Sequence, residues 1–83
     1  MEKNKTRFRV RRIDGDKGEV ALVGEFPSRK EANHAIKADS MRILGELLRE
    51  GLSGVPSMES TGPFVLFVPV PGHEFIYSIE MVL

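Results

Sequence analysis

The stretch SRKEANHAIKADSMRILGELLREG, residues 28–51, is typical of one long amphipathic helix and decides the fold class. Ser28 and Glu31 form a capping-box pair, in which two side chains satisfy free N–H groups at a helix start. Apolar residues then recur at helical spacing and form one stripe: Ala32, Ala35, Ile36, Ile43, Leu44, Leu47 and Leu48. Asp39 is a poor helix former inside this stretch, and the final glycine suits a helix end. The pattern predicts a helix over residues 29–50.

Strand-like segments flank this helix on both sides. Residues 7–13 alternate basic and apolar side chains, a dense turn cluster follows, and residues 19–26 alternate again. Two alternating segments joined by a short glycine-containing loop predict a β-hairpin. After the helix, residues 64–70 are almost wholly apolar, and residues 74–83 alternate once more beyond a Pro-Gly turn. The chain order is therefore ββαββ.

This order predicts an α+β fold, with the helix packed on a four-stranded antiparallel sheet. Residues 53–63 are polar, with glycine and proline, and are expected to form a loop. Pro69 lacks the N–H group that a strand ladder needs, so we expect residues 64–70 to lie at an edge. With the strands numbered 1 to 4 along the chain, the spatial order becomes 2-1-4-3, and strand 1 pairs with strand 4.

Length and composition indicate one globular domain over residues 1–83, with residues 1–5 a flexible basic N-terminus. The chain is 41% hydrophobic and 29% charged, which is ordinary for a folded domain. It contains no cysteine, so disulfides and thiolate metal sites are excluded. No apolar stretch is long enough for a signal peptide or a membrane span, so we expect no membrane contact and a cytoplasmic location.

The charge is distributed unevenly although the total is zero. Residues 1–12 hold six basic residues against one acidic residue, a net +5, so the remaining residues sum to −5. Arg7, Arg9 and Arg11 would line one face of the first strand. They could follow a phosphate backbone together with Lys3 and Lys5. They could equally pair with glutamates on the neighbouring strands, namely Glu19, Glu25, Glu74 and Glu80. The second interpretation explains the charge asymmetry without a partner.

No catalytic or metal-binding pattern emerges from the sequence. His34 and His73 stand alone, without a second imidazole or a carboxylate at ligand spacing. Asp14 and Asp16 begin like a calcium loop, but the middle ligands of such a loop are missing. No nucleophile and base can be paired. We therefore predict that the protein is not an enzyme and binds neither a metal nor a cofactor.

The remaining class is a non-catalytic module that binds another protein, for example an inhibitor or adaptor of a larger complex. An apolar strand at a sheet edge either aggregates or meets a partner, which points to Val65 and Phe67. The acidic side of the helix adds Glu46 and Glu50. The partner is a different protein or a second copy of the chain, which would form a homodimer. Nucleic-acid binding through the basic strand is the alternative function.

Overall fold

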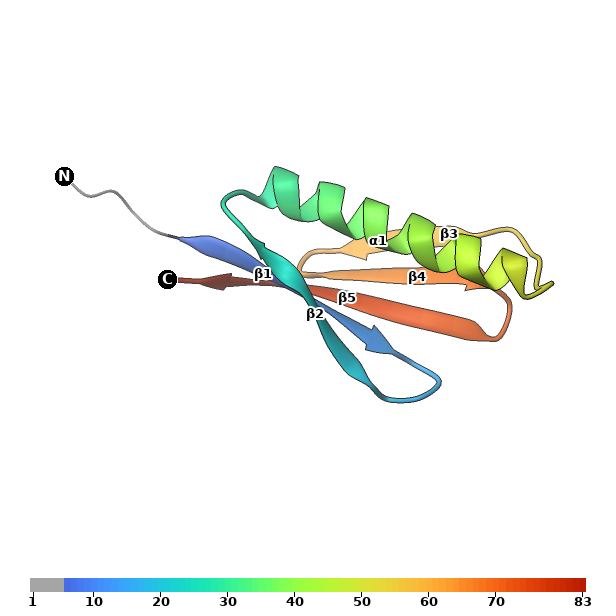
Figure 1. Cartoon of the computed structure of the whole chain (residues 1–83). Helices are drawn as coiled ribbons and strands as arrows, with labels where there is room; N and C mark the ends of the chain where they lie inside the picture. The colour runs from blue at the N-terminus through green and yellow to red at the C-terminus, as the bar shows by residue number, and fades with distance from the viewer. Residues whose placement is uncertain (1–5) are drawn as a thin grey trace.

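The computed structural model describes residues 6–83 and shows an α+β fold, with one helix packed on a five-stranded antiparallel sheet (Figure 1). The elements in chain order are β1 Arg7–Asp14, β2 Val20–Phe26, α1 Arg29–Arg49, β3 Ser57–Thr61, β4 Phe64–Val70 and β5 His73–Val82. The strands lie side by side in the order β2-β1-β5-β4-β3. Lys3 and Lys5 lie outside the described residues.

The first hairpin forms as predicted, with a tight turn and one irregularity. The Asp14 carboxylate accepts hydrogen bonds from the N–H groups of Asp16 and Lys17 at 2.9 and 3.1 Å, an arrangement that fixes such turns. Between β1 and β2 the register shifts at Val10 and Arg11, so Val23 has no direct partner on β1. This β-bulge increases the local twist of β2 at the outer edge of the sheet.

The helix begins and ends close to the predicted residues. The Ser28 hydroxyl accepts a hydrogen bond from the Glu31 N–H at 3.2 Å and caps the first turn. At the other end Gly51 has a φ of 90°, which glycine adopts without strain. The N–H of Leu52 then donates to the Leu47 carbonyl at 3.1 Å, closing the helix in the manner of a C-terminal cap.

The predicted sheet was incomplete, because a fifth strand forms within the segment expected to be a loop. β3 pairs with β4 from Ser57↔Val68 to Thr61↔Phe64, so β4 lies between β3 and β5 and is not an edge strand. Pro69 lies beyond the β3 ladder, and the β4–β5 register shifts between Phe67 and Val70. A proline is tolerated at such a bulge because no ladder hydrogen bond is required there.

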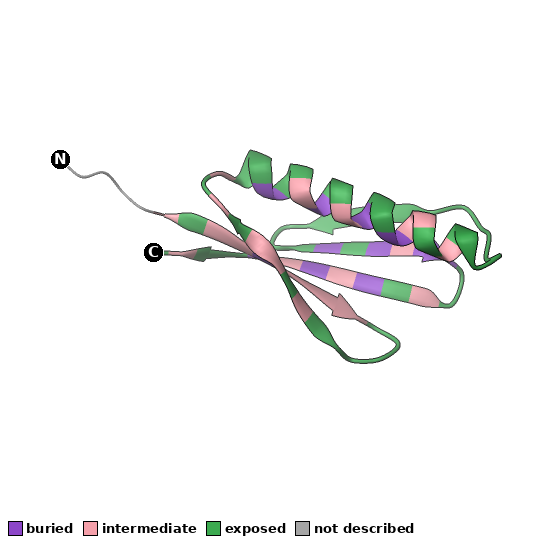
Figure 2. Ribbon diagram, in the orientation of Figure 1, coloured by how far each residue is buried: buried purple, intermediate pink, exposed green. Residues whose placement is uncertain are grey.

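The central pairing of the first and last strands is confirmed. β1 and β5 pair in unbroken register from Arg7↔Val82 to Asp14↔Phe75. The core lies between this central pair, β4 and the helix, and Figure 2 shows the buried positions on the underside of α1 and along β4 and β5. It contains Val10, Ala32, Ile36, Ile43, Val65, Phe67, Phe75, Tyr77 and Ile79. No helix within residues 6–83 has both the length and the apolar character to cross a bilayer.

Candidate functional site

The face of the sheet opposite α1 carries an uncovered row of apolar side chains. We call this the open face. Because directly paired residues of antiparallel strands share a face, the register places four apolar residues side by side across four strands. This apolar row consists of Val20, Ile13, Ile76 and Leu66, from β2, β1, β5 and β4 in turn. On one side of it follows a second line, in which exposed Leu22 and Phe64 flank the polar residues Arg11 and Ser78.

A shallow hollow of about 410 Å³ lies over this part of the open face. Its lining is mainly apolar and comes from Ile13, Phe64, Leu66 and Ile76, with Glu59 and Thr61 of β3 at its border. Phe64 is 48% exposed and Leu66 37% exposed. Contiguous exposed apolar side chains on a single domain mark contact surfaces more often than isolated ones do.

The sequence prediction for β4 selected the wrong side chains. Val65 and Phe67 are each only 4% exposed and belong to the core beneath α1. They cannot contact a partner while the domain is folded. The exposed side chains of this strand are the alternate ones, Phe64 and Leu66, because neighbouring residues of a strand point to opposite faces. The sequence pattern alone left both assignments open, since every residue from 64 to 68 is apolar.

The arginine row, Arg7, Arg9 and Arg11, continues along β1 from the apolar row toward the start of the strand and is matched internally. Arg9 Nε lies 2.9 Å from a Glu25 carboxylate oxygen, and Arg11 Nη1 lies 2.9 Å from one of Glu80. Arg7 reaches Glu25, and Arg9 reaches Glu80, at 3.7 Å. The predicted pairing with glutamates of adjacent strands is therefore confirmed for all three arginines. Two carboxylates against three guanidinium groups leave this end with a surplus of one positive charge.

A partly buried polar cluster that the sequence did not predict joins the helix to the sheet. The Asp39 carboxylate accepts hydrogen bonds from Arg12 at 2.7 and 2.9 Å, from the Tyr77 hydroxyl at 2.7 Å and from Arg42 at 2.9 Å. The side chain of Asp39 is 12% exposed, and Tyr77 is fully buried. We call these four residues the Asp39 cluster. Its local sequence signal is an acid on the apolar side of a helix with Arg42 three residues further on.

The pKa shifts of Asp39 and Tyr77 suit a structural role for the Asp39 cluster. Burial would raise the pKa of Asp39, but the hydrogen bonds from Tyr77, Arg12 and Arg42 outweigh it and leave this pKa below its ordinary value of 3.8. Burial and the hydrogen bond to Asp39 raise the pKa of the Tyr77 hydroxyl. Both shifts move away from neutrality, whereas a general acid or base works best with a pKa near the working pH. The cluster therefore holds fixed charges that anchor α1 to the sheet.

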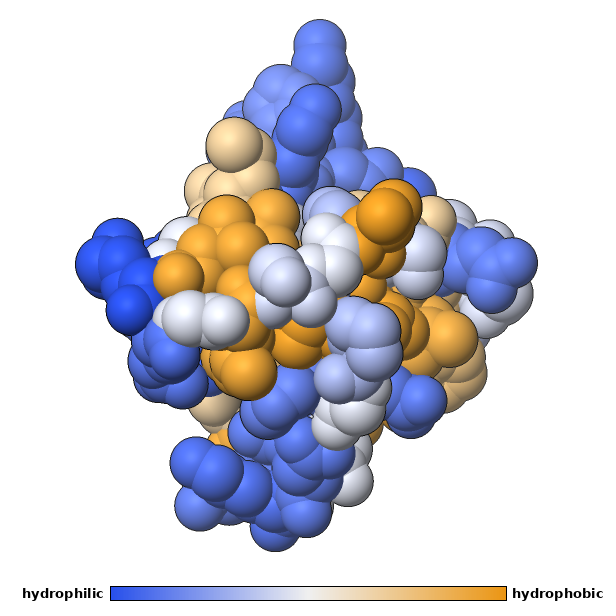
Figure 3. Space-filling view, turned by 90° about the vertical axis from the view of Figure 1, so that its right-hand side faces the viewer, coloured by the Kyte–Doolittle hydropathy of each residue, from blue (hydrophilic) through white to orange (hydrophobic). Residues whose placement is uncertain are grey.

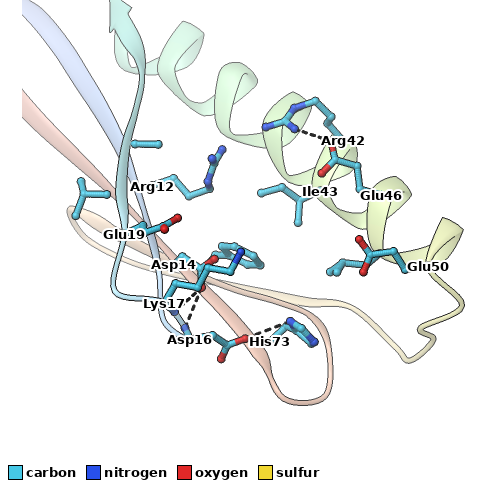
Figure 4. Close-up of a pocket in the computed structure, with 14 residues that line it drawn as sticks. Arg12, Asp14, Asp16, Lys17, Glu19, Arg42, Ile43, Glu46, Glu50 and His73 are labelled. Atoms are coloured by element: carbon cyan, nitrogen blue, oxygen red, sulfur yellow. Dashed lines mark hydrogen bonds and ion pairs between the residues drawn. The ribbon is translucent and has the colours of Figure 1, made fainter.

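A cleft of about 420 Å³ opens between the β1–β2 turn, the second half of α1 and the start of β5 (Figure 4). Asp16 and His73 meet at its lower rim, with Oδ2 and Nδ1 3.2 Å apart. Glu46 and Glu50 lie at the helical rim, and Glu46 is held by Arg42 at 2.9 Å. The two glutamates predicted as partner contacts thus border this cleft and are not on the open face.

Charged side chains make up most of the lining of this cleft. None of the described residues that line it is a serine, threonine or cysteine, so it presents no hydroxyl or thiol nucleophile of these types. Across residues 6–83, no group of three or more histidine, cysteine or acidic side chains is placed to hold a metal ion. Acidic residues line much of the cleft, and those at the turn are engaged in local hydrogen bonds and the His73 contact.

A second group of exposed apolar residues lies where the helix ends. Figure 3 looks at this end of the molecule and shows apolar side chains gathered in its middle, surrounded by hydrophilic ones. Leu48 is 50% exposed, Leu52 36% and Val55 90%. These residues come from the last turn of α1 and the following loop, so they are separate from the apolar row, which spans four strands.

Comparison of the chain with protein-family models, with curated proteins and with solved structures gives no match. The function is therefore inferred from the surfaces described above.

Proposed function

We propose that this protein is a non-catalytic protein-binding module whose contact surface is the open face. The observation that carries the proposal is the apolar row, which crosses four strands on the side of the sheet that α1 does not cover. A flat, partly apolar surface of this kind suits another protein surface, because complementary apolar areas lose contact with water when they meet. The matching partner presents a flat apolar strip bordered by charged side chains.

The charges at the rim support a protein over a nucleic acid as the partner. The arginine row is largely neutralised by Glu25 and Glu80, whereas affinity for a phosphate backbone depends on unneutralised cations that displace counterions. Charged groups of both signs at the border of an apolar centre are typical of protein interfaces, where they give orientation and specificity.

Partner capture should depend on the open face and on no other exposed apolar group. We expect Phe64→Glu to reduce capture of the protein that the wild type retains from the native cell extract. The reduction should be at least about tenfold, since a charge in an interface centre is strongly unfavourable. Leu48→Glu is the matched control, because Leu48 is exposed to nearly the same extent, 50% against 48%. Quantitative affinity purification with mass spectrometry measures both, after circular dichroism has verified the fold.

Two results would contradict this assignment. Equal capture by the wild type and the Phe64→Glu variant would exclude the open face as the contact surface. Loss of capture with Leu48→Glu alone would move the contact surface to the end of the helix.

Nucleic-acid binding through Arg7, Arg9 and Arg11 remains the second candidate function, favoured by the one surplus positive charge of this row. If the internal ion pairs dominate, binding to double-stranded DNA and single-stranded RNA should be weak at physiological salt, with dissociation constants above about 10⁻⁵ M. Arg9→Ala should then change this weak binding little. Fluorescence anisotropy at two salt concentrations measures the effect. Tight binding that falls steeply with salt and weakens in Arg9→Ala would establish the nucleic-acid function instead.

A further inference from the structure

We propose that the partner of the open face is a second copy of this chain, packed face to face so that the two sheets form a sandwich with both helices outside. This inference rests on the proposed function and names the occupant of its contact surface. A domain with one helix covers one face of its sheet, and a second sheet is a natural cover for the other. Sheets packed in this way lie about 10 Å apart and interdigitate their inner side chains.

The apolar row can pack on the same row of a second copy because it runs straight across the strands. It runs across the strands through Val20, Ile13, Ile76 and Leu66. A two-fold axis parallel to this row, in the plane between two copies, places each row on its own counterpart. Such an isologous interface needs only one self-complementary surface. The hollow beside Leu66 and Phe64 provides space for side chains of the second copy.

The charges on the two sides of the row complement each other under the same axis. Arg11 lies two residues from Ile13 on one side, at the end with the surplus positive charge. Glu74 lies two residues from Ile76 on the other side, is exposed, and makes no ion pair within residues 6–83. Rotation about the row exchanges the two sides. Arg11 of one copy therefore approaches Glu74 of the second copy.

A two-fold axis along the strands would not give this complementarity. With that axis near β5, Glu74 would face Glu74 of the second copy and Glu80 would face Glu80. Like charges placed opposite each other across an interface are strongly unfavourable. The axis along the row places one glutamate, Glu59 at its β3 end, opposite its own counterpart, but gains two Arg11–Glu74 contacts, so the charges favour it over an axis on β5.

The free edge of β3 is less suited to self-association than the open face. All five residues of β3 are exposed, and β3 has a strand on one side alone. In an antiparallel pair of two β3 strands centred on the strand, Glu59 would oppose Glu59 of the second copy. Charged residues in edge strands are a common means of preventing such pairing.

Sedimentation velocity between about 1 and 500 μM, spanning the micromolar range in which small interfaces associate, tests the proposal on the full chain. We expect a monomer–dimer equilibrium in the wild type. Leu66→Glu should weaken the dimer at least about tenfold, while Met41→Glu, on the exposed side of α1, should leave the dissociation constant unchanged. Circular dichroism shows that both variants keep the fold.

A charge exchange tests the orientation without relying on the apolar row. Arg11→Glu and Glu74→Arg should each weaken the dimer, and the double variant should restore it toward the wild-type constant. A monomer at all concentrations would overturn the proposal, as would a dimer that Leu66→Glu leaves intact. A wild-type monomer that still captures another protein through Phe64 would overturn the second copy as the occupant, but would leave the protein-binding function standing.

Discussion

Replacing Asp39 by alanine is expected to lower the free energy of unfolding by about 2–4 kcal/mol. This is somewhat less than the roughly 3–5 kcal/mol measured when one partner of a fully buried ion pair is removed, because Arg12 and Arg42 are partly exposed. The carboxylate accepts hydrogen bonds from Arg12, Arg42 and Tyr77. Without it, the fully buried Tyr77 hydroxyl loses its acceptor, and the partly buried Arg12 loses its counter-charge. A domain of this size is stable by about 4–12 kcal/mol in total, so the loss is a substantial part of its stability.

Urea unfolding followed by circular dichroism measures this effect, and Glu46→Ala is the matched control. Glu46 also pairs with Arg42, but its side chain is 49% exposed, and exposed ion pairs contribute less than about 1 kcal/mol. In a double-mutant cycle, Asp39→Ala and Tyr77→Phe should be strongly non-additive, because they remove two ends of the same hydrogen bond. Similar losses of stability for Asp39→Ala and Glu46→Ala would show that burial adds nothing to this cluster.

The same cluster predicts a dependence of stability on pH. The pKa of Asp39 is lower in the folded chain than its ordinary value of 3.8, so the ionised carboxylate stabilises the fold. This contribution is fully present above pH 3.8 and is lost as the pH falls through the folded-state value. The stability of an Asp39→Asn variant should therefore decrease less between pH 5 and 2 than that of the wild type. Parallel decreases in the two proteins would contradict the role of Asp39.

The local signals in the sequence were sufficient for the elements that carry clear caps and periodicity. Ser28 and Gly51 mark the two ends of α1, and both act as expected in the structure. The alternation on either side of the Asp14 turn defined the first hairpin. The pairing of strand 1 with the last strand was also predicted, from Pro69 as a mark of an edge strand and from the charge match between the two strands. The pairing is confirmed, although the strand that contains Pro69 is not at an edge.

Two features depended on tertiary context and were missed. Ser57–Thr61 is polar and fully exposed, so it lacks the alternation that identifies a half-buried strand. Pro69 predicts an edge strand because it lacks an N–H group, but a bulge accommodates it within the sheet. The same limitation concealed the Asp39 cluster. Asp39 is a weak helix former by propensity, and its partners Arg12 and Tyr77 are 27 and 38 residues away in the chain. No local pattern could connect them.

The sequence does not show which alternate residues of the apolar strand face the helix, and the candidate site depends on that assignment. The register between β4 and β5 determines it. Val65 pairs with Tyr77 and Phe67 with Phe75, and these pairs lie in the core under α1. Phe64 and Leu66 are therefore on the open face. Substitutions at adjacent residues of β4 should consequently have opposite kinds of effect.

Phe67→Glu should unfold the domain, whereas Leu66→Glu should leave it folded and impair association. Phe67 is 4% exposed and packs near Phe75, with ring centroids 6.3 Å apart. Loss of this ring alone is expected to cost about 3–5 kcal/mol, and burial of an unpaired carboxylate adds to the loss. Leu66 is 37% exposed, so a glutamate there reaches water and should cost no more than about 1–2 kcal/mol, typical of partly exposed positions.

Circular dichroism and urea unfolding at low protein concentration separate the two effects, because association contributes little under these conditions. Phe67→Leu is the control for Phe67→Glu, since it keeps an apolar side chain and should retain a cooperative transition at reduced stability. If Phe67→Glu folds with nearly wild-type stability while Leu66→Glu unfolds, the two faces of β4 have been assigned the wrong way round. The contact surface would then consist of Val65 and Phe67, and the open face proposed for binding would be part of the core.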